Sequence, residues 1–421
     1  MDYQPFKTLI ELKKYDRALH FLHRYEALHP QDADIAFMLG EVYDRTDNLF
    51  EAERYYNKAI TLDPKKLLAY TNLESVLREQ TRNTECLDIL QKVRELAPHL
   101  DNVIKTSESM LTLTSGDLSG FQGYENRFHF KALKDAYEKP FFTRWKKGQD
   151  LKGKTVLLRY EQGLGDTIQF ARYANVLKAL GAKKVSVLCK KTLHTLLRTI
   201  KGVSETFDTL PAEAHFDFEV MMMSMPAILE TTRDEDIPGN PYLKVNPQDA
   251  KIWLDRMQPT GKLKVGLVWC GEMKKHLGWL AERMNRRRSI PLEQLRPILD
   301  VDCDFYSLQK GEKEQDLVDF VAAHPIKNPM IEVKDFYDTA CIIHNLDLVI
   351  AVDTSTAHLA GALGKKTWML TRLDGDWRWM SNRSDTPWYP SMELFRQTTF
   401  AEWRPLINVV AARLKELSNE G

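Results

Sequence analysis

Near the start of the chain, prolines recur at a fixed interval. Pro30, Pro64 and Pro98 follow one another at equal steps of 34 residues. Proline cannot continue an α-helix, so each of the three predicts a helix end. A repeat of this length is one helix–turn–helix unit that cannot bury its apolar face alone, so neighbouring units must stack.

This spacing is typical of the tetratricopeptide (TPR) repeat. The middle unit fits best, with large and small residues at the positions where two TPR helices meet: Leu39, Gly40, Tyr43, Ala52, Tyr56, Ala59 and Pro64. The third unit has Glu74 and Cys86 where small residues are usual, and the first has Pro5 inside its first helix. We interpret the repeat residues as packing residues. The stack is expected either to bind a protein partner on its concave face or to support the next domain or an oligomer contact.

Composition excludes several classes of protein. The 421 residues include 59 Lys+Arg and 59 Asp+Glu, a balance that argues against nucleic acid or an anionic membrane as partner of the whole chain. With 43% hydrophobic residues the chain can build sizeable cores. Its five cysteines are scattered without a CxxC pair, which favours a reducing compartment over a disulfide framework.

The N-terminus lacks the pattern of a signal peptide, and the longest apolar stretch, near 221–229, is too short to span a bilayer. The expectation is therefore a soluble cytoplasmic protein with no membrane span.

Beyond Gly116 the pattern changes to short apolar runs that alternate with helical stretches. The predicted strands are Thr155–Tyr160, Lys184–Cys189, Phe216–Met222, Val265–Cys270, Phe305–Gln309, Met330–Val333, Leu346–Val352 and Thr367–Leu370. Such runs are typical of parallel sheets covered on both faces. We predict TPR repeats over 1–115, a linker and a first Rossmann-like lobe over 116–245, and a second such lobe over 246–421. Ligands of such sheets bind beyond the carboxyl ends of strands.

The first strand-end loop runs from Tyr160 into a helix predicted over 168–180. Gly163 and Gly165 permit a tight turn and a close ligand approach, next to Gln162. Asp166 then places a carboxylate at the mouth of the cleft. The third glycine of a dinucleotide-binding fingerprint is absent, and Asp166 could equally be a helix cap.

The second loop, from Asp353 to His358, follows the most apolar predicted strand. Thr354 and Ser355 supply hydroxyls and backbone amides at a helix start that could hold a diphosphate, and His358 supplies an imidazole. The alternative is that Asp353 caps the helix and His358 is a core histidine.

Two basic features complete the candidate site. Arg286–Arg288 precede a predicted helix start and could clamp phosphates, although such a run is more often a solvated face. Lys310 lies at a strand end, where it could meet an anion. The acidic pattern at 300–304 precedes a strand, so we interpret it as a solvated turn; no metal site and no Walker A loop is predicted.

Together these segments resemble a known family. GLGDTIQFARY, RSIPLEQL, FYSLQKG, LDLVIAVDTSTAHLAGALGK, DWRWM and DTPWYPSMELFRQ look like the bacterial TPR-containing glycosyltransferases related to the ADP-heptose–lipopolysaccharide heptosyltransferases, over about Gly123 to Trp403. The resemblance implies a GT-B fold of two Rossmann-like lobes. It also implies metal-independent, inverting transfer from a nucleotide sugar bound mainly by the C-terminal lobe, with the acceptor facing the N-terminal lobe and no other cofactor.

Carried over residue by residue, the resemblance gives Asp166 the place of the general base. It gives Asp353, Thr354 and His358 the place of the sugar- and diphosphate-binding turn, and Arg288 that of a basic phosphate contact. A donor-side role for the segment that begins at Asp376 and Trp377 is our own inference.

The stretch Cys270–Asn285 departs from the relatives and leaves the donor open, ADP-heptose following from the resemblance alone. Three hypotheses remain: a glycosyltransferase acting on a protein or glycan, a catalytically silent TPR/GT-B interaction module, and another GT-B activity such as a sugar-nucleotide epimerase.

Overall fold

The computed structural model describes residues 3–137, 139–272, 278–311, 317, 320 and 326–420. Residues 273–277 of the divergent stretch lie outside the described residues. The chain divides into two compact units, Met1–Leu111 and Thr112–Gly421. Within the described part of the chain, no helix has the length and apolar character needed to cross a membrane.

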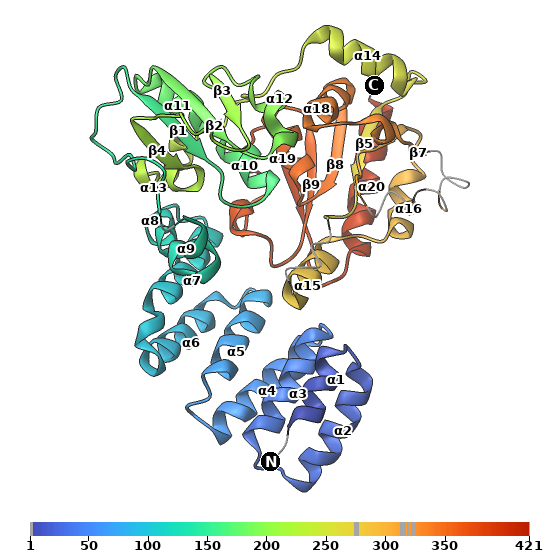
Figure 1. The fold of residues 1–421 in the computed structure, drawn as a ribbon. Helices are drawn as coiled ribbons and strands as arrows, with labels where there is room; N and C mark the ends of the chain where they lie inside the picture. The colour runs from blue at the N-terminus through green and yellow to red at the C-terminus, as the bar shows by residue number, and fades with distance from the viewer. Residues whose placement is uncertain are drawn as a thin grey trace. The chain divides into compact units, whose positions relative to one another are not determined.

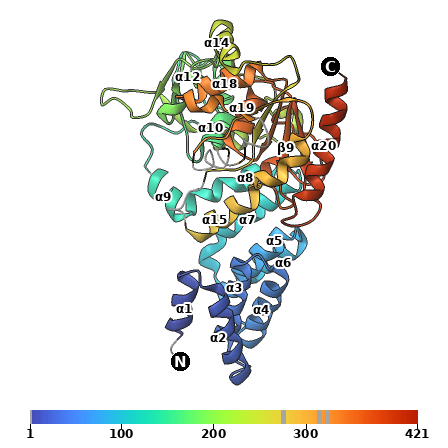
Figure 2. The same ribbon diagram turned by 90° about the vertical axis from the view of Figure 1, so that its right-hand side faces the viewer.

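Unit 1 is built from successive helices that pack on one another, α3 on α4 and α5 on α6 most extensively (Figure 2). They are α1 (Gln4–Glu11), α2 (Tyr15–Leu28), α3 (Ala33–Arg45), α4 (Leu49–Leu62), α5 (Leu67–Glu79), α6 (Asn83–Leu96) and α7 (Asp101–Thr114), in which the unit ends. The three repeat prolines lie just beyond the ends of α2, α4 and α6, as predicted.

Small and large residues interlock between α3 and α4. Gly40 lies against the ring of Tyr56, so close that a Cβ at Gly40 would be 2.6 Å from the ring carbon Cδ1. Ala52 and Ala59 are fully buried on the same helix as Tyr56. The TPR packing expected from the sequence is therefore present.

The first lobe of unit 2 contains a four-stranded parallel sheet in the order β3-β2-β1-β4. The strands are β1 (Thr155–Arg159), β2 (Lys184–Leu188), β3 (Glu205–Phe207) and β4 (Phe218–Met221). The helices of this part are α8 (Gly120–Tyr124), α9 (Lys131–Tyr137), α10 (Leu164–Phe170), α11 (Tyr173–Ala179), α12 (His194–Leu197) and α13 (Met225–Ile228). β1 pairs with β2 on one side and with β4 on the other, so the strand order reverses at β1.

The second lobe contains a six-stranded parallel sheet in the order β10-β9-β8-β5-β6-β7. The strands are β5 (Lys264–Val268), β6 (Asp304–Ser307), β7 (Ile326–Lys327), β8 (Leu348–Val352), β9 (Thr367–Thr371) and β10 (Met392–Arg396). This is the doubly wound order of a Rossmann fold, in which the order reverses between β5 and β8. Ligands of such sheets bind outside the carboxyl ends of the strands at that reversal.

Helices cover both faces of the second sheet (Figure 1). The helices of this lobe are α14 (Pro247–Met257), α15 (Trp279–Arg288), α16 (Arg296–Leu299), α18 (Phe336–Asn345), α19 (Ser355–Ala362) and α20 (Arg404–Asn419). Residues of α16 and α20 share one apolar core with inward-facing residues of the strands, while α19 packs on β8 and β9. TPR repeats followed by two Rossmann-like lobes, the architecture of the GT-B fold, confirm the predicted fold class.

Several predicted elements were wrong. The strand expected at Met330–Val333 is the 3₁₀ helix η9 (Pro329–Glu332), because Asn328 caps it by accepting from the Met330 amide and Pro329 opens it. The single helix expected over 168–180 is two helices, α10 and α11, and the Arg172 side chain between them donates from Nε to the Gln169 carbonyl at 2.7 Å. The arginine run precedes the 3₁₀ helix η7 (Leu292–Leu295), as predicted, but it also forms the end of helix α15, which the sequence did not indicate.

We expect Gly40→Leu to loosen unit 1, because the new side chain would meet the buried Tyr56 ring. Overpacking of this kind costs about 1–3 kcal/mol. Hydrogen exchange resolved by peptide should show faster exchange in α3 and α4. Asn57→Leu, which adds the same side chain at an exposed position of α4, should leave exchange as in the parent; equal exchange in the two variants would contradict the packing argument.

Candidate active site

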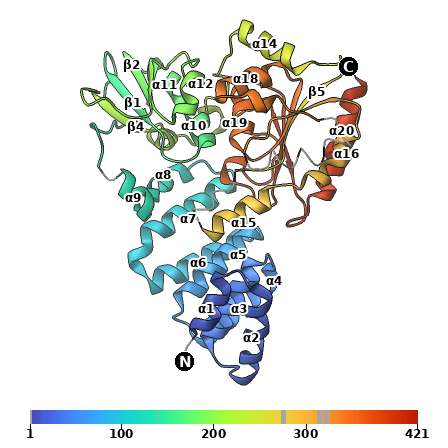
Figure 3. The ribbon, with the colours of Figure 1, turned by 45° about the vertical axis from the view of Figure 1, so that its right-hand side comes forward.

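The starts of two helices, one from each lobe of unit 2, meet at the candidate site. α10 follows β1 and α19 follows β8, and the two helices lie side by side (Figures 1 and 3). A Cβ at Gly165 would be 2.8 Å from Cδ2 of His358 and 3.5 Å from the Cα of Ser355. Gly165 therefore lets the first lobe approach the Asp353–His358 turn of the second, whereas the sequence suggested a close approach to a ligand.

Asp166 lies in the first turn of α10. The helix is capped by Gly163, and the carboxylate oxygen Oδ2 of Asp166 accepts from the Gly163 amide at 2.7 Å. The other oxygen, Oδ1, accepts from Nη2 of Arg378 at 2.5 Å. Asp166 is thus not the N-cap residue itself, although it closes the first turn. Its side chain keeps 21% of its surface exposed, so it borders accessible space.

Arg378 is the residue of this site that sequence reasoning missed. It belongs to η10 (Trp377–Trp379), in the segment between β9 and β10. Besides Asp166 it contacts Gln169, whose Oε1 accepts from Nε at 3.0 Å, and Asp376, whose Oδ1 accepts from Nη1 at 2.8 Å. The signal was present in the DWRWM motif, where only Asp376 and Trp377 were singled out.

The donor-side turn begins with Asp353, directly after β8. The N-cap of α19 is Thr354, so Asp353 does not cap that helix. Burial first, and then the neighbouring Asp376 carboxylate, raise the pKa of Asp353 above its ordinary value. Burial alone would also raise the pKa of Asp376, but Arg378 outweighs it and lowers that pKa. Of the two carboxyl groups, Asp353 therefore holds a proton more strongly.

His358 is enclosed by aromatic side chains. Its Nδ1 lies 2.9 Å from the hydroxyl of Tyr389, and its ring centroid lies 5.1 Å from that of Trp379. Burial, followed by the positive charge of Arg378, lowers the pKa of His358 to about 3. The imidazole is therefore neutral near pH 7 and can act on a ligand only through neutral hydrogen bonds. Its Nε2 lies 3.9 Å from Oδ1 of Asp353.

The three arginines of the run at the end of α15 point to different surroundings. Arg286 is exposed, and Arg287 is buried with its guanidinium 4.7 Å from the ring centre of Phe400. Arg288 reaches the Asp353 turn, where Nη1 lies 3.4 Å from the Asp353 carbonyl oxygen. Gly271 gives it room, since a Cβ there would be 2.4 Å from the guanidinium.

A pocket of about 320 Å³ lies beyond the carboxyl ends of β5, β6 and β8. Its wall includes hydroxyls of Thr354 and Ser355, the side chain of Lys310, and the apolar Phe336, and Leu164 of α10 contributes from the first lobe. Lys310 donates from Nζ to the Met330 carbonyl at 2.7 Å. The pocket thus combines polar and apolar surface at the point where the strand order reverses.

The loop between β1 and α10 is fixed by a buried ion pair that the sequence did not reveal. Glu161 accepts from Arg127 twice, at 2.7 Å from Nε and 2.9 Å from Nη2, and from the amide of Met223 at 3.1 Å. Next to it, Gln162 donates to the hydroxyl of Tyr124 at 3.2 Å. These contacts set the path of the chain into Gly163 and Asp166.

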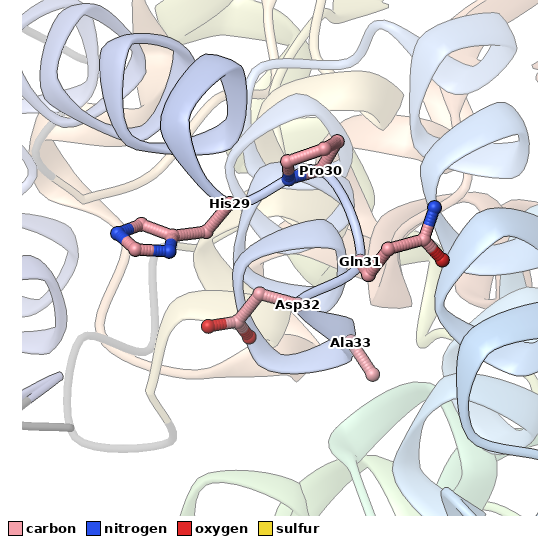
Figure 4. A pocket seen from close by; sticks show the side chains of 5 residues that line it. All are labelled: His29, Pro30, Gln31, Asp32 and Ala33. Carbon is pink, nitrogen blue, oxygen red and sulfur yellow. The ribbon is translucent and has the colours of Figure 1, made fainter.

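A hollow at the turn between α2 and α3, lined by His29, Pro30, Gln31, Asp32 and Ala33, is not a candidate site (Figure 4). The side chain of Asp32 in this hollow already accepts hydrogen bonds within unit 1. Oδ1 of Asp32 accepts from two amides at the start of α3, and Oδ2 accepts from the Tyr3 hydroxyl at 2.9 Å.

In the acidic pattern at 300–304, the carboxylate of Asp304 is held by neighbouring protein groups. Asp304 begins β6, at the edge of the sheet opposite the strand ends, and accepts from the Thr260 amide at 2.5 Å and from Lys327 at 3.0 Å. Among the described residues, no three His, Cys, Asp or Glu side chains are grouped so that they could hold a metal ion.

Comparison with known proteins gives relatives for both parts of the chain. Residues 33–66 match the family model of the tetratricopeptide repeat. The chain is 27% identical over 442 residues to the protein FlbA of Caulobacter vibrioides, a match that covers 98% of this chain and 72% of that protein.

Among solved structures, it is similar to the ADP-heptose lipopolysaccharide heptosyltransferase II of E. coli, at 13% identity and a TM-score of 0.45, over 62% of this chain and 99% of that one. A glycosyl transferase family 9 protein of Veillonella parvula matches at 8% identity and a TM-score of 0.48, over 65% and 97% of the two chains.

We expect Glu161→Ala to lower the free energy of unfolding by about 3–5 kcal/mol, because it leaves the Arg127 guanidinium buried without its main partner. Thermal or denaturant unfolding of the full chain measures this. In the double variant Glu161→Leu, Arg127→Met, both charges are replaced by apolar groups, and most of the stability should return. A single variant as stable as the parent would show that the pair does not support the loop.

Proposed function

We propose that the chain is a metal-independent, inverting glycosyltransferase that moves a sugar from a nucleotide sugar to a hydroxyl of a protein or glycan acceptor. One observation carries the proposal. The first turn of α10, which carries Asp166, lies against the Asp353–His358 turn of the second lobe at the strand ends, beside a pocket of about 320 Å³. Arg378 of the second lobe donates to Asp166 there. The motif resemblance assigns these same residues to base and donor.

The pocket is suited to the nucleotide part of a donor. Its volume lies at the lower end of the range of small-molecule sites, roughly 300–1,000 Å³. Phe336 offers apolar surface for a base, and the hydroxyls of Thr354 and Ser355 with the first amides of α19 offer donors for phosphate. ADP-heptose is the donor suggested by the resemblance, and other nucleotide sugars fit the same chemistry.

Asp166 is assigned the role of general base. As the acceptor oxygen attacks the anomeric carbon, its proton passes to the carboxylate, the new carbon–oxygen bond forms, and the bond to the diphosphate breaks. Attack on the face opposite the leaving group inverts the anomeric configuration. A carboxylate has about four lone-pair positions, so the contacts with Gly163 and Arg378 leave positions for the acceptor.

The leaving diphosphate gains negative charge, which preorganised donors stabilise. Arg288 beside the Asp353 carbonyl and Lys310 in the pocket wall supply positive charge. His358, being neutral, contributes hydrogen bonding only. The TPR repeats are assigned to contact with a protein acceptor or an accessory partner.

One observation favours the silent-module alternative. Both oxygens of Asp166 already accept hydrogen bonds from the protein, as they would if the residue were purely structural. Turnover is therefore the deciding property.

A panel of ADP-, UDP-, GDP- and CMP-linked sugars, with and without magnesium, tests donor binding. The proposal expects one nucleotide class to raise the melting temperature by mass action, independently of magnesium. The same donor should then add its sugar mass to an acceptor in a lysate. Conversion of the donor without an acceptor would indicate the epimerase, and binding without any turnover would indicate the silent module.

We expect Asp166→Asn to lower the transfer rate by about 100- to 10,000-fold, the usual contribution of a general base, while the donor still binds. Mass spectrometry of the acceptor and thermal shift with the donor measure the two properties. Asp255→Asn, which changes an exposed carboxylate on α14, serves as the control and should keep both. Undiminished turnover in Asp166→Asn would remove this residue as the base.

A further inference from the structure

We propose that Arg378 is a positioning residue that holds the base Asp166 in its reactive orientation from the opposite lobe. This inference rests on the proposed function and names a residue that neither the motif resemblance nor the comparisons assign.

The guanidinium of Arg378 uses its three nitrogens on three different partners. Nη2 donates to Asp166 at 2.5 Å, Nε donates to Gln169 at 3.0 Å, and Nη1 donates to Asp376 at 2.8 Å. Asp166 and Gln169 lie three residues apart on α10, so they share one side of that helix. The rigid, planar guanidinium therefore makes two hydrogen bonds to α10 and one to its own segment. A lysine ammonium cannot reproduce this geometry.

Arg378 is itself held firmly. Its side chain is only 7% exposed, and the guanidinium carbon lies 4.2 Å from the ring centre of Trp377. The Trp377 ring in turn contacts Phe121 edge-on, with centroids 5.7 Å apart, and lies 5.4 Å from that of Tyr124. The segment that carries Arg378 is thus packed on aromatic residues of α8, which hold it in place.

This arrangement links the base to the donor turn. Asp166 belongs to the first lobe and Asp353 to the second, and a base must lie within hydrogen-bond reach of the acceptor proton while the donor is bound. Without Arg378, the Asp166 carboxylate keeps only the Gly163 amide on Oδ2 and can rotate about its last side-chain bond. A displacement of about 1 Å at a reacting group costs about 100-fold in rate.

A second arginine joins the same two lobes and provides the control. Arg383 donates from Nη1 to Asp234 at 2.8 Å, and from Nε to Asp385 at 2.7 Å. Its hydrogen bonds and ion pairs go to these two carboxylates and to Met380, and not to Asp166, Gln169 or Asp376. If Arg378 only ties the lobes together, its loss and the loss of Arg383 should have similar effects.

The test compares Arg378→Ala, Arg378→Lys and Arg383→Ala in the full chain, with kcat, KM for acceptor and donor affinity measured for each. We expect Arg378→Ala to lower kcat about 100-fold with donor affinity within about threefold of the parent, and added guanidinium ion to restore at least about tenfold. Urea at the same concentration should restore nothing. Arg383→Ala should keep the parent kcat.

If the alanine variant fails to fold, Arg378→Lys provides the test. It keeps the positive charge but removes the planar arrangement of guanidinium donors. A reduced kcat with the parent melting temperature supports positioning, and a parent kcat overturns it. An alanine variant whose kcat matches that of Arg383→Ala, or that guanidinium does not rescue, also overturns it. Absence of transfer by the parent protein would instead remove the proposed function, and this inference with it.

Discussion

The close approach of α10 and α19 is the contact on which the candidate site depends. Gly165 faces the buried His358 ring at a distance that leaves no room for a Cβ. Because each helix starts at the carboxyl end of a strand next to the reversal of strand order, their meeting joins the ligand-binding edges of both sheets. Asp166, one residue beyond Gly165, is thereby brought to the Asp353 turn. A larger residue at 165 would push the first turn of α10, with Asp166, away from the Asp353–His358 turn.

The positive charge of Arg378 offsets the negative charge of the carboxyl groups that meet where α10 approaches α19. Asp166, Asp353 and Asp376 gather around Arg378, whose positive charge also lowers the pKa values of Asp376 and of His358. Like charges this close favour protonation of one member, and the pKa of Asp353 is the one that rises. The surroundings of Asp353 and Asp376 therefore shift the pKa values of these two carboxyl groups in opposite directions. Asp166 and Asp376 pair with the Arg378 cation, while Asp353 directly precedes Thr354 and Ser355, which line the pocket.

The sequence predicted the elements whose formation depends on residues close together in the chain. Continuous β-branched runs gave the central strands, and proline spacing gave the TPR helices. β10 was missed because Met392–Arg396 alternates buried and exposed residues at a sheet edge, and β3 because it has only three residues. The loops before α10 and α19 follow strands β1 and β8, as predicted. Arg378 was not, because its partner Asp166 lies 212 residues away and such a contact leaves no local pattern.

The two interpretations of Asp166 that the sequence left open are compatible in the structure. As a capping group, its carboxylate is fixed by the Gly163 amide on one oxygen. As a base, it needs a fixed orientation and a vacant lone pair, and the cap supplies the first without using up the second. The Arg378 contact fixes the other oxygen in the same way. Helix capping and catalysis are therefore compatible roles for Asp166, because the contacts that stabilise the turn are also those that would orient the base.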